Sequence, residues 1–559
     1  MSPPESVQVS SAHVADPVAA LAQAREAMAA QRYETTVALL NQILDLPPNP
    51  ASQDAQELIG NAREALGEID RARVEYQLYL KLFANGDGVA RVKSRLDKLG
   101  TAIAANTKSG KGKTGGAPQT TYWGSLSQSY YGGQSQIRDE TTIITPATDA
   151  TQIDVQNISS KDQSSLVSNA DANARYRGNG WDNRFVFRDV HVLSLLSAQP
   201  TQNRLSALYA DFKNEPMGFD ARIGRQSSTS GGVLGRFDGV VAHYTISDAW
   251  RVGVLGGTPA EKGIGKRKYF YGATLDNDTL LDGLGVGLFA IEQRTESSVD
   301  RRALGTELRY FSQTASVFSL FDYDIKYHEV NVASVQGTLT MHNGATVNLL
   351  YDYRRSPTLQ LTNALLGTPA RSLKQLLLTE QQNQIEEDAV NVTPISKVAL
   401  LGTTYPITEH WQLGLEARVS SLTSTHATAT QPAVDGTGNI FAYTVQAIGT
   451  GIGSPNTVVV FNGSRLMSDA ADSWLASMNT RIRPTEHWAV EPTLRFFVQD
   501  AINKTTLKRL SPTLRMTYQF GEKISLESEI SYERSHSQGK LTDEKSKLLF
   551  YYIGYHWDF

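Results

Sequence analysis

The last segment of the chain, from Lys547 to Phe559, alternates between the two faces of a β-strand and strongly limits the possible folds. One face carries only apolar or aromatic side chains, which are Leu549, Tyr551, Ile553, Tyr555, Trp557 and Phe559. The other face carries Leu548, Phe550, Tyr552, Gly554, His556 and Asp558 and becomes more polar toward the last residue. In water such an aromatic strand face would promote aggregation, whereas lipid stabilises it. The pattern predicts a strand that faces a membrane.

The same segment resembles the C-terminal β-signal of bacterial outer-membrane proteins. That signal ends in an aromatic residue, usually phenylalanine, with further aromatic residues at alternate positions before it. The matching positions here are Tyr555, Trp557 and Phe559. The resemblance implies an outer-membrane β-barrel whose partners are outer-membrane lipid, lipopolysaccharide and the barrel assembly machinery.

Beyond Tyr122, runs of roughly ten alternating residues recur between turn residues, as a transmembrane barrel requires. Candidate strands lie near residues 121, 171, 184, 203, 218, 236, 250, 267, 282, 301, 315, 329, 344, 394, 411, 439, 456, 473, 487, 506, 523 and 546. The list predicts about 22 strands, an even number as in single-chain bacterial barrels, within a range of about 16 to 22.

Three turns share one pattern, at Ile246–Trp250, Ile407–Trp411 and Pro484–Trp488. Each joins two alternating runs and places a tryptophan at the start of the next strand, at the depth of the membrane interface. All three fall on the side where the chain enters and leaves the barrel, which predicts short periplasmic turns. The longer connections, at 138–170, 356–393 and 422–437, then fall on the extracellular side.

Residues 16–100 have apolar side chains at helical spacing. The stretch 31–49 aligns with 67–85 at an offset of 36 residues. The segment from Ile59 to Gly67 resembles the first helix of a tetratricopeptide repeat, with Ala72 and Pro48 at that family's small-residue and proline positions. The resemblance implies about two repeats in the periplasm, and a plain pair of helical hairpins is the alternative.

A capping helix is predicted from Val89 to Leu99. Such repeats bind partners, so we expect a periplasmic or inner-membrane synthesis or secretion partner to dock on this domain, at Tyr33, Tyr76 and Tyr79. Residues 1–15 are predicted to be disordered, and the Gly-rich, basic segment 101–120 is predicted to be a flexible linker before the barrel at 121–559. Because the first residues do not form a secretory signal, we expect a mature chain whose signal peptide has been removed.

Composition excludes several functions. The chain has no cysteine, which rules out disulfides and thiolate metal sites, and its net charge of -4 does not favour nucleic acid. The ten histidines show no metal-ligand spacing, and GGVLG at 231–235 lacks the strand-to-helix context of a phosphate loop. We therefore predict no cofactor, no metal, no catalytic residue and no enzyme activity.

Charged residues that alternate with apolar ones predict the lining of the lumen, because Arg facing lipid at mid-depth costs about 2 to 4 kcal/mol. The candidates are Asp220, Arg222, Arg225, Arg236 and Asp238. The motif GRQ at 224–226, followed by GRFDG at 235–239, resembles strands of porin-like and exopolysaccharide-secretion barrels. The charged residues either contact hydrated cargo or form a network that braces the wall.

A helical repeat domain before an outer-membrane barrel resembles the exopolysaccharide export porins, of the cellulose synthase outer-membrane subunit or poly-N-acetylglucosamine porin type. That resemblance implies export or anchoring of a surface biopolymer, with biofilm formation as its context. A protein-fibre or adhesin assembly component and a solute porin are the alternatives. A wide barrel requires a plug, and the helix predicted over 371–390, with a capping box from Ser372 to Gln375, is either that plug or an extracellular decoration.

Overall fold

The computed structural model describes residues 17–30, 32–44, 51–66, 69–83, 88–89, 91–96, 118–145, 150–197, 199–227, 232–261, 268–296, 298–429 and 431–559. The chain divides into two compact units, Met1–Gly115 and Gly116–Phe559, and each is described by itself. The predicted disordered segment 1–15 and most of the predicted linker lie outside the described residues, while residues 119 and 120 already belong to the first strand. Among the described residues, no helix has the length and apolar character needed to cross a membrane.

The N-terminal unit consists of helices that pack against their neighbours in the chain. They are α1 (Pro17–Ala29), α2 (Tyr33–Leu44), α3 (Ser52–Ala65) and α4 (Ile69–Leu82), and residues 91–96 are also helical. The start of α4 follows the start of α2 by 36 residues (69 − 33). Fully buried residues repeat at the same offset, in the pairs Thr36 and Ala72, Leu40 and Tyr76, and Ile43 and Tyr79. The internal repeat read from the sequence therefore corresponds to two equivalent helical hairpins.

Two of the three tyrosines predicted to dock a partner are core residues, which corrects that prediction. Tyr76 is fully buried and donates a hydrogen bond to Glu64 at 2.6 Å. Burial, with the Glu64 carboxylate beside it, raises the pKa of Tyr76. Tyr79 is also fully buried and accepts hydrogen bonds from the Gln53 side chain at 3.1 Å and from the Gly88 backbone at 3.0 Å. Helical periodicity placed both tyrosines on one face, and that face is the interior.

Replacing Gly60 with alanine is expected to destabilise the helical unit. A Cβ atom at Gly60 would lie 2.4 Å from the ring of Tyr76, which is held by its hydrogen bond to Glu64. Overpacking of this kind costs about 1 to 3 kcal/mol. Hydrogen exchange over residues 52–82 of the full chain measures the effect. The control is Gln77→Ala on the exposed side of α4, and equal exchange in the two variants would contradict the packing argument.

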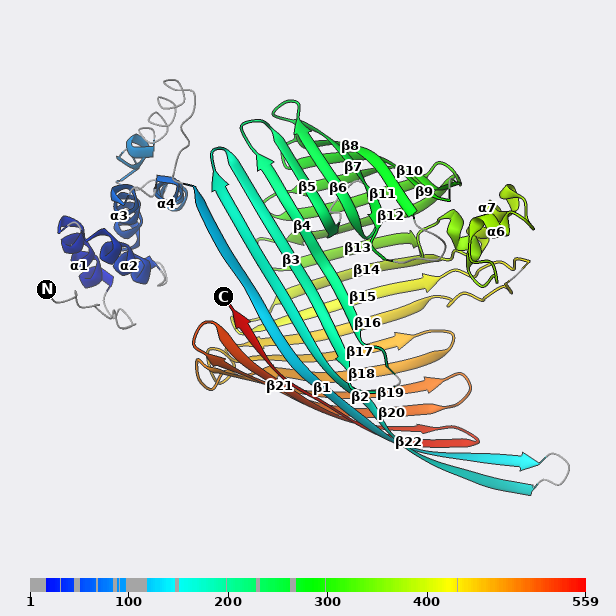
Figure 1. Cartoon of the computed structure of the whole chain (residues 1–559). Helices are drawn as coiled ribbons and strands as arrows, with labels where there is room; N and C mark the ends of the chain where they lie inside the picture. Colours follow the sequence, from blue (N-terminus) through cyan, green and yellow to red (C-terminus); the bar gives the residue numbers. More distant parts are fainter. Residues whose placement is uncertain are drawn as a thin grey trace. The chain divides into compact units, whose positions relative to one another are not determined.

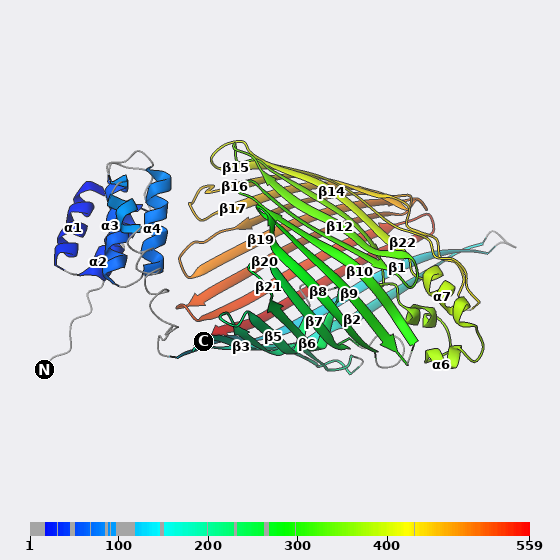
Figure 2. The same cartoon turned by 90° about the horizontal axis from the view of Figure 1, so that it is seen from above.

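The second unit is a closed antiparallel barrel, and the predicted count of 22 strands is confirmed. Figures 1 and 2 show the strands in chain order around the wall. They are β1 (Gln119–Thr145), β2 (Ala150–Gly178), β3 (Trp181–Ser194), β4 (Gln202–Asn214), β5 (Phe219–Ser227), β6 (Arg236–Thr245), β7 (Trp250–Pro259), β8 (Lys268–Leu281), β9 (Leu284–Thr295), β10 (Ser298–Phe311), β11 (Ala315–Asp324), β12 (Glu329–Thr340), β13 (Thr346–Arg355), β14 (Ile395–Pro406), β15 (Trp411–Leu422), β16 (Ile440–Thr450), β17 (Val458–Met467), β18 (Ala471–Arg481), β19 (Trp488–Ala501), β20 (Thr506–Phe520), β21 (Ile524–Gln538) and β22 (Thr542–Asp558). Pairing of β1 with β22, in register from Ser125 opposite Asp558, closes the barrel.

The barrel has two distinct ends. The start of β1 and the end of β22 lie at one end, which we call the C-terminal end, and the opposite end is the distal end. The three repeated turns lie at the C-terminal end, before β7, β15 and β19. In the first two, the backbone N–H of Ile246 and Ile407 donates to the carbonyl of Trp250 and Trp411, at 2.9 and 2.8 Å. The repeated sequence therefore encodes the same turn.

The predicted loop at 138–170 is wrong, because residues 138–145 and 150–170 belong to β1 and β2. The two strands pair from Gln119 opposite Arg177 up to Thr145 opposite Ala150. This hairpin projects beyond the rest of the distal end in Figures 1 and 2. The ladder between β2 and β3 reaches only Ser165, with one further backbone bond from Leu195 to Ser164.

The two faces of each strand differ in character. Residues that face outward are large, apolar and exposed, for example Phe321, Leu349, Leu401 and Ile553. Residues that face inward include the buried polar side chains Thr274, Asp322 and Asp352. On β22, the outward set contains Tyr551, Ile553, Tyr555 and Trp557, in register with Leu526 and Ile530 of β21. The wall therefore has an apolar outer surface and a polar inner surface.

Candidate functional site in the barrel lumen

The inner wall of β2 to β7 carries paired charges near the C-terminal end. Arg222 on β5 donates from Nε to Oδ1 of Asp211 on β4 at 2.5 Å, and its guanidinium lies 4.3 Å from the ring centre of Tyr209. Asp220 Oδ2 lies 2.8 Å from Nδ1 of His243 on β6. Asp211, Asp220, Arg222 and His243 line a hollow of about 510 Å³. Since Asp220 and Arg222 are both paired with neighbouring strands, they brace the wall as well as line the lumen.

Arg225 and Asp238 do not share this face, which corrects their assignment to the lumen. The ladder pairs Arg225 with Asp238 directly, one step beyond the pair of Gly224 with Gly239. Two residues away on the same face, Ile223 and Val240 are exposed on the outer surface. The side chains of Arg225 and Asp238 form an ion pair at 2.7 Å, close to the distal ends of β5 and β6. Side chains of a strand alternate with a period of two residues, so Arg222 and Arg225, which are three positions apart, lie on opposite faces although they are close in the sequence.

Arg236 begins β6 at the distal mouth. Its guanidinium donates to Glu261 at 2.9 Å. Together with Phe237, Phe270 and Arg301 it lines a hollow of about 250 Å³, whose other side is formed by Thr358 and Gln360. Arg236 is therefore brought next to the long connection between β13 and β14 and apart from Asp220 and Arg222.

That connection folds as a compact unit, which we call the mouth loop (residues 356–393). It contains a 3-10 helix η1 (Leu361–Leu365) and helices α6 (Leu373–Leu376) and α7 (Gln382–Asn391). Ser372 caps α6 by accepting from Gln375 N at 3.2 Å, as predicted, but α6 ends after one turn, so the single helix predicted over 371–390 is two. Its buried core consists of Leu359, Leu361, Ala364, Leu365, Leu373, Leu376, Ile385 and Ala389. Figure 1 shows α6 and α7 at the end of the barrel opposite the C-terminus.

A buried cluster joins the mouth loop to the inner wall. Lys268 on β8 lies 3.1 Å from the carboxylate of Asp300 on β10, which is fully buried. The same carboxylate accepts from the backbone N–H of Thr362 at 2.9 Å, and Lys268 donates to Oγ1 of Thr362 at 2.5 Å. Asn331 on β12 accepts from the backbone of Leu359 at 2.9 Å. We call Lys268, Asp300 and Thr362 the latch.

A second contact lies at the turn between β11 and β12. Lys326 Nζ is 3.3 Å from Oε1 of Glu386 on α7. Burial lowers the pKa of Lys326, and the Glu386 carboxylate partly offsets this effect. Burial also raises the pKa of Tyr327, beside the acidic groups of the same turn. The mouth loop is therefore held by ionic contacts at two places on the wall.

The sequence patterns did not reveal the latch. Asp300 lies where the ladder between β9 and β10 shifts register, between Val299 and Arg301, so simple alternation does not assign it to either face. Lys268 follows residues 262–267, which lie outside the described part of the chain. Asp300 and Lys268 come from different strands, and only the folded wall brings their side chains together. Neither residue carries a local signal.

No protein-family model and no curated protein matches this sequence. Among solved structures, it is similar to the ferric enterobactin receptor PfeA of Pseudomonas aeruginosa (TM-score 0.43, 10% identity, covering 80% of this chain and 81% of that one). It is also similar to the translocation pore of the P pilus usher PapC (TM-score 0.36, 9% identity, 76% and 99%) and to OccK2 of Pseudomonas aeruginosa (TM-score 0.34, 8% identity, 78% and 98%).

These likenesses are too distant to assign a function, so the class of the protein rests on its own wall. In lipid, all backbone groups of a spanning segment must be paired, and a closed sheet meets this condition. The closed wall of 22 strands with an apolar outer surface defines a membrane-spanning β-barrel of the outer-membrane type.

Proposed function

We propose that this chain is an outer-membrane conduit that exports or anchors a surface biopolymer, with exopolysaccharide as the favoured cargo. The latched mouth loop carries this proposal. Barrels of about 22 strands enclose a lumen that would leak if it were empty, and known barrels of this size are plugged. A loop with its own buried core, held to the inner wall by the latch, supplies a closure that the passing chain displaces.

The mechanism is passive conduction. The driving force comes from synthesis or assembly on the inner side, and the wall only guides the chain. Displacing the mouth loop breaks the contacts of Asp300 with Thr362 and of Lys326 with Glu386, while the braced pairs of Arg222 and Asp220 keep the wall in place.

The helical unit lies in the periplasm in this proposal and docks a synthesis or secretion partner. Tyr33 is partly exposed and stays a candidate for this contact. A stripe on α4, formed by Val74, Leu78 and Leu82, is exposed by 60%, 39% and 59%. Residues spaced by four lie on one face of a helix, and exposed apolar stripes serve as interaction surfaces. The stripe therefore takes the role first given to Tyr76 and Tyr79.

A second candidate, assembly of a protein fibre or adhesin, is favoured by the β1–β2 hairpin. Within the described residues, no strand pairs with the outer edge of β2 over 150–161, a stretch of roughly 40 Å at about 3.3 Å per residue. Unpaired edge groups bind an extended segment of another protein by adding a strand. An open solute porin is the third candidate, and the latched mouth loop argues against it.

The test compares bacteria that lack this chain with bacteria that carry it, by measuring polysaccharide in the periplasm and on the surface. Export of polysaccharide requires that the polymer accumulates in the periplasm and disappears from the surface. A further strain, in which a short turn replaces residues 139–158, separates the candidates. If that strain and the deletion strain both lose a surface fibre while surface polysaccharide stays normal, the fibre assembly role replaces the export role.

A further inference from the structure

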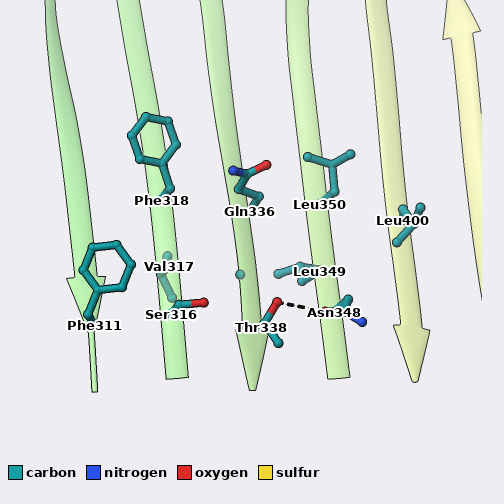
Figure 3. Close-up of a pocket in the computed structure, with 11 residues that line it drawn as sticks. Phe311, Ser316, Val317, Phe318, Gln336, Thr338, Asn348, Leu349, Leu350 and Leu400 are labelled. Atoms are coloured by element: carbon teal, nitrogen blue, oxygen red, sulfur yellow. Dashed lines mark hydrogen bonds between the residues drawn. The ribbon is translucent and has the colours of Figure 1, made fainter. Parts of the chain in front are cut away.

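A neutral hollow of about 590 Å³ lies on the inner wall of β10 to β14, near the C-terminal end. Figure 3 shows its residues on neighbouring strands. The inward-facing lining consists of Phe311, Ser316, Phe318, Gln336, Thr338, Asn348, Leu350 and Leu400. The ladders place Phe318 opposite Gln336, and Gln336 opposite Leu350, so these side chains share one face. The hollow is therefore a feature of the lumen.

The lining combines two kinds of surface. Phe311, Phe318, Leu350 and Leu400 supply apolar area, and two of them offer aromatic faces. Thr338 donates to Oδ1 of Asn348 at 2.8 Å. This hydrogen bond fixes the orientation of the Asn348 amide and therefore of its Nδ2 group. Among the described residues, no side chain or backbone group pairs with the amide of Gln336. None of the lining residues is charged, in contrast to the ion pairs on β2 to β7.

A sugar ring has the same two kinds of surface. Its C–H face packs on an aromatic ring, and its rim of hydroxyl groups pairs with amide and hydroxyl side chains. The volume of the hollow falls in the range of about 300 to 1,000 Å³ that ligand pockets occupy. The lining holds no cation, and Arg309, which the ladder places opposite Phe318, is paired with Asp278 at 3.1 Å. A purely apolar ligand would leave the amide of Gln336 and Nδ2 of Asn348 without partners inside the hollow.

We propose that this hollow is a binding site for neutral sugar units of a chain that passes along the wall. The site rests on the proposed export function, and it names the chemical class of the cargo. Phe318 stacks on the ring, and Gln336 and Asn348 hydrogen-bond to its hydroxyl groups. Since the site lies near the C-terminal end, the chain meets it before it reaches the latch at the distal end.

The test measures binding of neutral hexasaccharides, cellohexaose and N-acetylchitohexaose, to the purified full chain in detergent by calorimetry, with the anionic hexagalacturonate for comparison. We expect a neutral hexasaccharide to bind more tightly than the anionic one. Phe318→Ala and Gln336→Ala should each weaken binding by about tenfold, as lost ring stacking or one lost hydrogen bond implies. The matched control is Phe321→Ala on the outer face of the same strand, which should change affinity by less than about twofold.

Altered mobility of the unheated protein in detergent gels verifies that each barrel is folded, and Gln336→Ala tests the site even if loss of the Phe318 ring disturbs folding. The site is overturned if neither neutral hexasaccharide binds or if the anionic one binds as tightly as the neutral ones. It is also overturned if Phe321→Ala weakens binding as much as Phe318→Ala. Absence of binding together with periplasmic polymer in the deletion strain would remove the site and leave the conduit. If the purified protein binds the neutral hexasaccharide but bacteria that lack the chain keep normal surface polymer, the conduit role is wrong and the binding site remains.

Discussion

Removing the mouth loop, by joining β13 to β14 with a short Gly-Ser linker in place of residues 356–393, is expected to turn a small or silent current into a large and steady one. The measurement is single-channel conductance of the purified protein in planar bilayers. A single substitution should act in the same direction. Asp300→Ala leaves Lys268 and the backbone N–H of Thr362 without their buried partner. Breaking a buried pair costs about 3 kcal/mol or more, which shifts the closed-to-open ratio by about a hundredfold.

The matched control is Asp278→Ala, which removes a largely exposed carboxylate on β8 and breaks only its 3.1 Å pair with Arg309. Its conductance should equal that of the unmodified chain. The closure role of the mouth loop fails if the unmodified chain already conducts strongly and deletion changes nothing. An open porin, or a pore closed by a separate partner, would then describe the protein better.

An arginine on the outer wall should destabilise the barrel strongly, whereas one on the inner wall should not. Leu401 and Leu400 are adjacent residues near the middle of β14, and Leu401 is 56% exposed on the outer face. Leu400 faces the lumen beside Leu350. We expect Leu401→Arg to lower the free energy of unfolding in lipid vesicles by about 2 to 4 kcal/mol, because the charge enters hydrocarbon. Leu400→Arg should cost much less, because its charge reaches water.

Denaturant unfolding in vesicles, followed by tryptophan fluorescence, gives both values. The same chemical change at two neighbouring positions cancels differences in side-chain size and strand propensity. Equal losses would mean that the two faces of β14 have similar surroundings. The assignment of the inner and outer surfaces, and with it the neutral hollow, would then be wrong.

Much of the barrel could be predicted because lipid imposes a two-residue period on each spanning strand. Most predicted strand starts fall within a few residues of the observed ones, for example 411 for Trp411 and 506 for Thr506. The clear failure is at 138–170, where β1 and β2 leave the barrel. There, polar side chains occupy both faces, as in the run Arg138, Asp139, Glu140 and Thr141, so no apolar period marks the strand. An apolar period predicts a strand only where one face of the strand contacts lipid.

The candidate site was predicted less completely, for a related reason. Alternation within one short strand put Asp220 and Arg222 on one face, and the ladder turns that face toward the lumen. Arg225 and Asp238 were assigned by a motif, and the observed register places them on the outer face. The latch joins β8, β10 and the mouth loop, with 62 residues between Asp300 and Thr362 along the chain. Such contacts depend on the closed wall, which local patterns do not describe.

The seam between β1 and β22 has a consequence for how this protein acquires its structure. Leu126 pairs with Trp557, and 431 positions separate them (557 − 126). Contacts between residues so distant in sequence slow folding, because a long segment must be ordered before they form. Until the last strand arrives, the first strand presents an open edge that invites pairing with other chains. The chain therefore depends on being kept from premature association throughout its synthesis and transit.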